Sequence, residues 1–177
     1  MKKRLFLIAC LGFLASLATF TYAADKTDLE KDAITAVDYF KKSDPEIKKW
    51  FETAHGYAIF PAIAKGAIGI GGAHGKGLVY EKGEYIGEAT LSQATIGFQL
   101  GGQVYSEVIF FETKEALDSF KASKFALSAQ ASAVAAAEGA SKNAKYQLGV
   151  AVFTLAKGGL MYEASVGGQK FKFKAKK

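Results

Sequence analysis

The sequence predicts an α+β fold in which two N-terminal amphipathic helices precede a glycine-rich, mostly antiparallel sheet. Apolar residues recur with helical spacing before residue 56, and a two-residue period with frequent glycine follows it almost to the end of the chain. Many short strands interrupted by glycine favour a sheet that is strongly curled or barrel-like. One short helix is expected to be inserted within the strand-rich part, near residues 113–122.

The first 23 residues have the organisation of a cleaved signal peptide. Residues 1–4 are basic, residues 5–20 are largely apolar, and small residues lead up to a cleavage site after Ala23. A retained membrane anchor is the alternative, because the apolar run is about the minimum for a span. Cys10 lies too early for a lipoprotein cleavage box, so lipid anchoring is not expected. These features predict an exported, periplasmic protein with one domain over residues 24–177.

The composition indicates a folded, mildly basic domain. Half of the residues are hydrophobic, which is enough to bury a core. Three of the 23 Lys and Arg residues lie in the leader, so its removal leaves 20 cations against 17 acids, a net charge of +3. The remaining cations are all lysine, whereas DNA-reading proteins use arginine to fork onto guanine and phosphate. Nucleic acid is therefore not an expected partner, while an anionic membrane surface suits this charge.

Two helices are expected at the start of the mature chain. Thr27 to Glu30 forms a capping box, and an apolar stripe then predicts a helix over residues 28–42. Asp44 and Pro45 begin a second helix, which carries an apolar stripe that includes Trp50 and Phe51 and closes at Gly56. These helices either cover the sheet or lie on a membrane interface. In the second case Trp50 and Phe51 insert, and Lys48 and Lys49 meet the headgroups.

Short strands are expected from residue 57 onward. Residues 57–60 form an apolar strand that ends at Pro61, and residues 65–73 form a second strand with one glycine face, where a backbone or ligand can approach closely. Residues 74–77 and 82–84 read as turns. Further strands are expected over residues 78–81, 85–92, 94–101, 104–112, 124–134, 144–156, 160–167 and 169–174. Alanine-rich residues 124–134 also have a high helix propensity, but their two-residue period favours a strand.

The last strand places Lys170, Lys172 and Lys174 on one face. Lysine at this position blocks stray pairing of an edge strand. A second interpretation is a basic rim that faces anionic headgroups.

The sequence offers little catalytic chemistry. The run from Gly69 to His74 lacks the last glycine of a dinucleotide fingerprint and the helix that should follow it, so no nucleotide is expected. His55 and His74 have no carboxylates at ligand spacing, so neither a metal nor another cofactor is expected. No nucleophile elbow of the Gly-x-Ser-x-Gly type is present. A non-enzymatic protein is therefore expected, and a small hydrolase would require a serine and a histidine to meet in a cleft.

Several motifs in a fixed order resemble the SYLF domain family. They cover nearly all of the mature chain and comprise residues 57–61, 65–72, 75–77, 96–103, 107–111, 116–120, 124–129, 157–161 and 165–171. The resemblance implies a lipid-binding domain, and eukaryotic members bind phosphoinositides and in some cases actin. Actin is not an expected partner here, because the chain has a leader and no SH3 domain. The family's usual arginine is absent near Lys157, which argues against phosphoinositide-type headgroup recognition and leaves general anionic-lipid affinity open.

The resulting hypothesis is an exported, non-enzymatic domain of the bacterial cell envelope that binds phospholipid or an anionic membrane surface. Lysines near the glycine-rich turns, Lys65, Lys76 and Lys157, are the expected headgroup contacts. Lys48, Lys49, Trp50 and Phe51 of the second helix complete the set of candidate lipid-binding residues. The alternative is a structural or interaction module of the periplasm that binds a protein partner.

Overall fold

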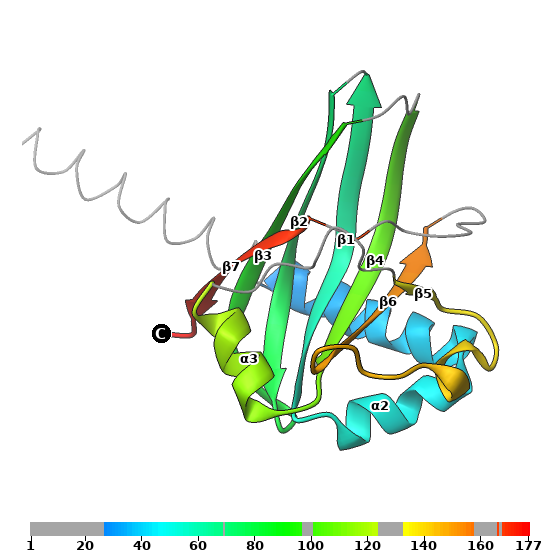
Figure 1. The fold of residues 1–177 in the computed structure, drawn as a ribbon, viewed down its shortest axis with the longest axis vertical. Coiled ribbons are helices and arrows are strands. Elements are labelled where there is room, and N and C mark those ends of the chain that lie inside the picture. Colours follow the sequence, from blue (N-terminus) through cyan, green and yellow to red (C-terminus); the bar gives the residue numbers. More distant parts are fainter. Residues whose placement is uncertain (1–26, 69, 97–100, 124–132, 158–165, 167) are drawn as a thin grey trace, which may run out of the picture.

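The computed structural model describes residues 27–68, 70–96, 101–123, 133–157, 166 and 168–177. One seven-stranded sheet runs through this part of the chain in the order β5-β6-β4-β1-β2-β3-β7 (Figure 1). Its strands are β1 Gly56–Ile68, β2 Ile70–Glu81, β3 Glu84–Ile96, β4 Gly101–Phe111, β5 Val134–Ala135, β6 Val150–Ala156 and β7 Lys170–Ala175. Neighbouring strands pair antiparallel except β5 and β6, which are parallel.

The α+β class and the mostly antiparallel pairing are therefore confirmed, but the expected barrel-like or strongly curled sheet is wrong. The sheet is open, with β5 at one edge and β7 at the other. Closure would require the edge strands to pair with each other, and β5 offers only two residues for pairing. In this open sheet, glycine allows neighbouring strands to pack closely. A sequence pattern of short strands interrupted by glycine is compatible with an open sheet as well as with a closed barrel.

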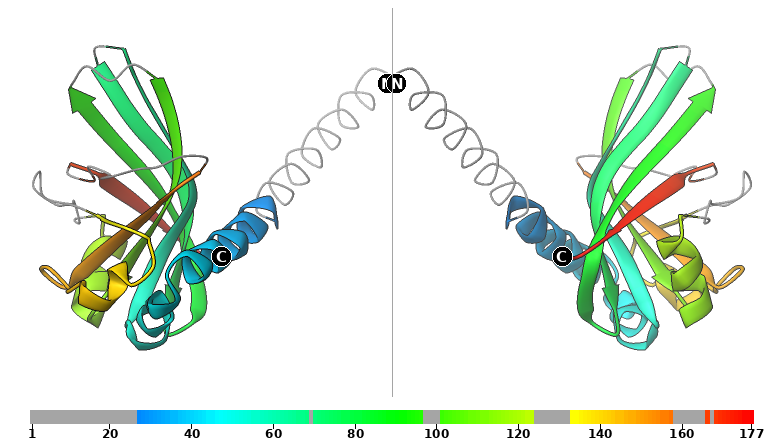
Figure 2. Two further views of the ribbon diagram at one scale, coloured as in Figure 1. Left: turned by 90° about the vertical axis from the view of Figure 1, so that its right-hand side faces the viewer. Right: turned by 90° about the vertical axis from the view of Figure 1, so that its left-hand side faces the viewer.

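Helices cover both faces of the sheet. The N-terminal helix, described over residues 27–43, leads through the 3-10 turn η1 Pro45–Ile47 into α2 Lys48–Thr53. The carboxylate of Asp44 caps the N-terminus of η1 by accepting a hydrogen bond from the Glu46 N–H at 3.2 Å. Helix α3 Lys114–Lys121 lies on the opposite face from the N-terminal helix (Figure 2), and a second 3-10 turn, η2 Ala140–Asn143, precedes β6.

Strand β1 continues through Pro61, where the sequence suggested an end. The register of β1 shifts at this point against both neighbours: against β2 between Ile59 and Ala62, and against β4 between Phe60 and Ile63. A β-bulge tolerates the missing N–H of proline. The hydroxyl of Ser106 donates to the Pro61 carbonyl at 2.7 Å, which satisfies the displaced backbone.

Other expected boundaries also change. The supposed turn at residues 74–77 lies inside β2, because its two glycines allow β1 to pack closely there. The expected strand over 144–156 begins only at Val150, since Leu148 and Gly149 form a tight turn with φ of 51° and 78°. The hairpin turn at Lys82 and Gly83 is confirmed. Most of the strands expected over 124–134 and 160–167 lies outside the described residues.

The sheet carries one hydrophobic core on each face. On the α3 face, buried residues of β1 to β4 pack with Leu117 and Phe120 of α3 and with Phe171 of β7. On the opposite face, which we call the helical face, Ala33, Ala36 and Phe40 of the N-terminal helix cover a second core. The sheet residues of this second core are Ile59, Leu78, Val108, Phe110, Ala151 and Phe153. Both cores are dense in aromatic and branched side chains, as a stable α+β domain requires.

A carboxyl group is buried within the α3-face core. Glu107 of β4 is fully buried beside Thr154 of β6, and the Gln169 amide donates to its Oε2 at 3.0 Å and to the Tyr105 hydroxyl at 3.4 Å. Its Oε1 has no hydrogen-bond partner in the described structure. Burial raises the pKa of Glu107 to about 8, against the smaller opposing effect of the Gln169 hydrogen bond. The group is therefore predominantly protonated in the folded protein at neutral pH.

This burial predicts that Glu107→Gln stabilises the domain at alkaline pH. The unfolded carboxyl ionises near pH 4.5 and the folded one near pH 8, so the wild type loses stability as pH rises through this window. Glutamine is neutral at every pH in this range. The free energy of unfolding of the variant is therefore expected to match that of the wild type near pH 4 and to exceed it by a few kcal/mol at pH 8.5. Urea unfolding at both pH values measures this. The exposed Glu84→Gln serves as control, and an equal response of both variants would contradict the prediction.

The glycines of β2 predict a second stability effect. A Cβ on Gly77 would lie 2.5 Å from the Ile59 carbonyl oxygen and 2.6 Å from a ring carbon of Phe60, whereas a Cβ on Gly66 would meet nothing within 4 Å. Gly77→Ala is therefore expected to cost about 1–3 kcal/mol of unfolding free energy, because two buried strands must separate. Gly66→Ala is the matched control and is expected to be close to neutral. Equal destabilisation by both, measured by urea unfolding, would disprove the close-packing role.

Candidate functional site

Part of the helical face is open to solvent. The N-terminal helix covers the part of the sheet before the bulge. Beyond the bulge, most helical-face side chains are exposed, while Ile63, Leu91 and Tyr105 are buried on the α3 face. We call this area the open patch. It consists of Ala62, Ala64, His74, Lys76, Thr90, Ser92, Val104, Lys170 and Lys172. Five of these nine side chains are small or short, and the carboxylate of Glu88 lies on the same face at the border, next along β3 from Thr90.

Strand pairing places the lysines of the open patch in two adjacent rows. Ala62, Lys76, Thr90 and Lys172 lie opposite one another across β1, β2, β3 and β7, and His74, Ser92 and Lys170 form part of the next row. Directly opposed residues in a ladder share one face of the sheet. Because neighbouring strands lie about 5 Å apart, the Cα atoms of Lys76 and Lys172 are separated by about 10 Å. The open patch therefore presents spaced ammonium groups above a smooth sheet surface.

The three lysines expected near glycine-rich turns do not form one cluster. Lys76 lies inside the open patch. The backbone N–H of Lys157 donates to the Val104 carbonyl at 3.0 Å, so Lys157 lies at the β6 border of the patch. Lys65 follows the alternation of β1 to the α3 face, where it is half-buried. The basic surface is completed instead by Lys170 and Lys172 of β7.

The aromatic residues of α2 pack on the sheet. Trp50 lies with its ring centroid 5.8 Å from that of Phe110 and 5.1 Å from that of Phe153, and its indole N–H donates to the Ser141 carbonyl at 3.2 Å. Phe51 packs edge-on against Phe110 at 4.8 Å. Of the two interpretations of these helices, the structure shows the one in which they cover the sheet. Lys48 and Lys49 are exposed, and Lys49 pairs with Glu46 at 3.1 Å.

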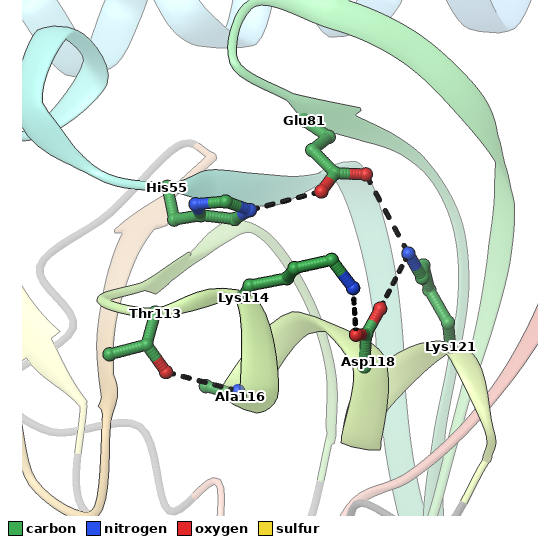
Figure 3. Close-up of polar contacts among 7 residues, drawn as sticks. All are labelled: His55, Glu81, Thr113, Lys114, Ala116, Asp118 and Lys121. Carbon is green, nitrogen blue, oxygen red and sulfur yellow. Dashed lines mark hydrogen bonds and ion pairs between the residues drawn. The ribbon is translucent and has the colours of Figure 1, made fainter.

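A chain of charged side chains ties α3 to the β2–β3 hairpin (Figure 3). His55 Nε2 lies 3.0 Å from Glu81 Oε1, and Lys121 bridges Glu81 at 3.6 Å and Asp118 at 2.7 Å. The hydrogen bond from His55 is the main reason why the pKa of the Glu81 carboxyl lies below its ordinary value. Hydrogen bonds from Lys114 and Lys121 lower the pKa of Asp118 to about 2. These contacts fasten α3 over the core, which is a structural role.

The described residues show no arrangement typical of catalysis. His55 is engaged with Glu81, His74 is exposed in the open patch, and neither hydrogen-bonds a serine hydroxyl in the described structure. In the parts of the chain that were placed, no group of three or more His, Cys, Asp or Glu side chains is arranged to hold a metal ion. Likewise, no described helix is both long and apolar enough to cross a membrane.

Sequence reasoning did not place Lys170 and Lys172 among the candidate site residues, although it noted the basic face of their strand. The signal that joins them to Lys76 is the pairing of β7 with β3, which brings residues nearly 100 positions apart in sequence onto one surface. Alternating lysine in the last strand and one lysine in a glycine-rich strand are uninformative until that pairing is known.

Comparison with known proteins gives two matches. Residues 92–177 match the model of the Ysc84 family, described as Las17-binding protein actin regulator. This region extends from the second half of β3 through β7 and includes Lys170 and Lys172. A relative named beta cell expansion factor A, from Aeromonas veronii, is 29% identical over 142 residues. The alignment covers 78% of this chain and 53% of the relative, so the chain spans about half the length of that protein.

These matches agree with the ordered motifs of the sequence, which run from the glycine-rich strands to the end of the chain. The family model covers the C-terminal part of the sheet, and the relative extends the similarity over most of the chain. Residues 92–177 thus carry a match to the Ysc84 (SYLF) family model, and the similarity to the relative extends over most of the chain.

Proposed function

We propose that this protein is an exported binding domain whose open patch docks on an anionic phospholipid surface. The observation that carries the proposal is the shared face of Lys76, Lys170 and Lys172, which Glu88, opposite Lys174, borders at one end. The match of residues 92–177 to the Ysc84 (SYLF) family model supports a binding module of the lipid-binding or actin-regulator type. The basic leader followed by an apolar run supports export to the periplasm.

The shape of the open patch suits a planar, charged surface. Its side chains on β1 and β3 are small, so headgroups can approach these strands closely, while the lysines of β7 have long stems at the sheet edge. Each lysine near an anionic membrane contributes about 1 kcal/mol of attraction. Three lysines together then provide about 3 kcal/mol, which is enough for reversible peripheral binding. Lys157 at the border adds to this attraction.

The remaining candidate lysines have secondary places in the proposal. Lys65 faces the other side of the sheet, and Lys48 and Lys49 lie on α2, so none of these three belongs to the open patch. Trp50 and Phe51 support binding indirectly, because they hold the helical cover that leaves the patch exposed.

A protein partner in the cell envelope is the second candidate. Val104 is 44% exposed in the open patch, and the lysine-rich strand β7 forms an edge of the sheet. Exposed apolar side chains beside an edge strand are a feature of protein docking sites as well as of membrane-facing surfaces. The description of the matching family as an actin regulator likewise names a protein interaction.

Flotation with liposomes tests the proposal. The wild type is expected to bind vesicles that contain phosphatidylglycerol much more strongly than pure phosphatidylcholine vesicles, and this difference is expected to shrink as salt is added. The double variant Lys76→Gln/Lys172→Gln is expected to bind the anionic vesicles about 30-fold more weakly, which corresponds to about 2 kcal/mol.

The double variant Lys42→Gln/Lys142→Gln is the control, because it removes the same charge from exposed positions outside the open patch. It is expected to bind almost as well as the wild type. Equal weakening in both variants would show that only net charge matters. Failure of the folded wild type to float with either vesicle, together with capture of one stoichiometric envelope protein, would favour the protein-partner function.

A further inference from the structure

A pocket of about 400 Å³ opens at the end of the molecule where α2 meets the loop before β6. It lies apart from the open patch and shares no residue with it. Its walls come from three segments that are distant in sequence: α2, the end of β4 and residues 144–146. The lining residues are Lys49, Trp50, Thr53, Glu112, Ala144, Lys145 and Tyr146.

Two aromatic rings form one wall of this pocket. The ring centroids of Trp50 and Tyr146 are 4.8 Å apart and their planes are inclined by 55°. Trp50 is held from behind by Phe110 and Phe153 and by the hydrogen bond to the Ser141 carbonyl. The wall is therefore rigid before any ligand binds. Inclined aromatic faces of this kind attract cations, and an ammonium group beside them gains further from a carboxylate.

The pocket also carries charges of both signs. The Glu112 carboxylate and the Lys145 ammonium are both exposed, and neither has an ion-pair partner in the described structure. Burial, and then the negative charge of Glu112, raises the pKa of the Tyr146 hydroxyl to about 12. Glu112 and Tyr146 both line this pocket. Lys49 adds a second ammonium group, although it is shared with Glu46. A cation-attracting wall and an anion-attracting rim thus lie within one pocket.

We propose that this pocket binds a phosphoammonium zwitterion, that is, a phosphate joined by a short carbon chain to an ammonium group. The ammonium group would lie against Trp50 and Tyr146 beside Glu112. The phosphate would be bound by Lys145, with Lys49 in support. This site is separate from the open patch, whose lysines would select a ligand only by its negative charge. The same chemistry occurs in free phosphoethanolamine and in the headgroups of zwitterionic phospholipids.

A neighbouring turn favours the membrane as the source of the zwitterion. Leu148 follows two residues after Tyr146, its side chain is 97% exposed, and its φ of 51° is a left-handed conformation that leucine rarely adopts. A bulky apolar residue held in that conformation at the tip of a turn suggests selection for an apolar contact. Inserted into the acyl region of a bilayer, Leu148 would bring the pocket to the level of the headgroups.

Intrinsic fluorescence provides a direct test, because Trp50 is the only tryptophan of the chain. Titration with O-phosphoethanolamine is expected to give a saturable change in emission. Ethanolamine alone and inorganic phosphate alone are expected to bind at least 10-fold more weakly. Glu112→Gln and Lys145→Gln should each weaken the zwitterion about 10-fold or more, while Lys142→Gln, an exposed lysine outside the pocket, should leave its affinity unchanged.

A titration without a saturable change would overturn the proposal, as would phosphate alone binding equally well or Glu112→Gln having no effect.

Vesicles of phosphatidylethanolamine and phosphatidylcholine then identify the source of the zwitterion. For a membrane headgroup, Leu148→Ser is expected to weaken vesicle binding and to leave the soluble titration unchanged; equal vesicle binding by Leu148→Ser would assign the pocket to the free zwitterion. Lys76→Gln/Lys172→Gln should not alter the soluble titration, so this site and the open patch can fail independently.

Discussion

The bulge at Pro61 is the constraint on which the rest of the structure depends. β1 lies between β4 and β2 in the middle of the sheet, and both of its ladders change register within the same few residues. Before the bulge, the side chains of Ile59 and Phe60 are buried on opposite faces, so that half of the sheet requires a cover on each side. Beyond it, Ala62 and Ala64 replace large apolar residues on the helical face, and no cover is needed there. The bulge thus separates the part of the sheet that is covered on both faces from the part that carries the open patch.

The same division explains how a small domain can expose a broad sheet face without becoming unstable. The strands that carry the open patch remain anchored through their other face, where Ile63, Leu91 and Tyr105 are buried. Close approach of β2 to β1 at Gly77 adds rigidity near the junction. Lysines on β7 then act both as a barrier against stray strand pairing and as a basic rim, so the two interpretations of that strand are compatible.

Local patterns predicted what local forces determine. The capping residue Asp44, the hairpin turn at Lys82 and Gly83 and the apolar stripe of Trp50 and Phe51 were recognisable because each depends on neighbours within a few residues. The turn expected at residues 74–77 was wrong, because the glycines there allow the close approach of β1 and do not form a turn in their own strand. Glu107 gave no signal within its apolar run, since its burial depends on β6 and Gln169. The open patch was likewise invisible before strand order was known.

Trp50 shows why packing in the core and contact with a ligand need not exclude each other. The sequence left two roles for this residue, covering the sheet or inserting into a membrane, and the structure shows the first. Yet Trp50 is only half-buried, and its remaining surface forms a wall of the pocket beside Tyr146. A ring already fixed by the core loses little further freedom on binding, so recognition there costs less entropy than insertion of a mobile side chain. The part of α2 expected to meet lipid can therefore do so at the pocket without leaving the sheet.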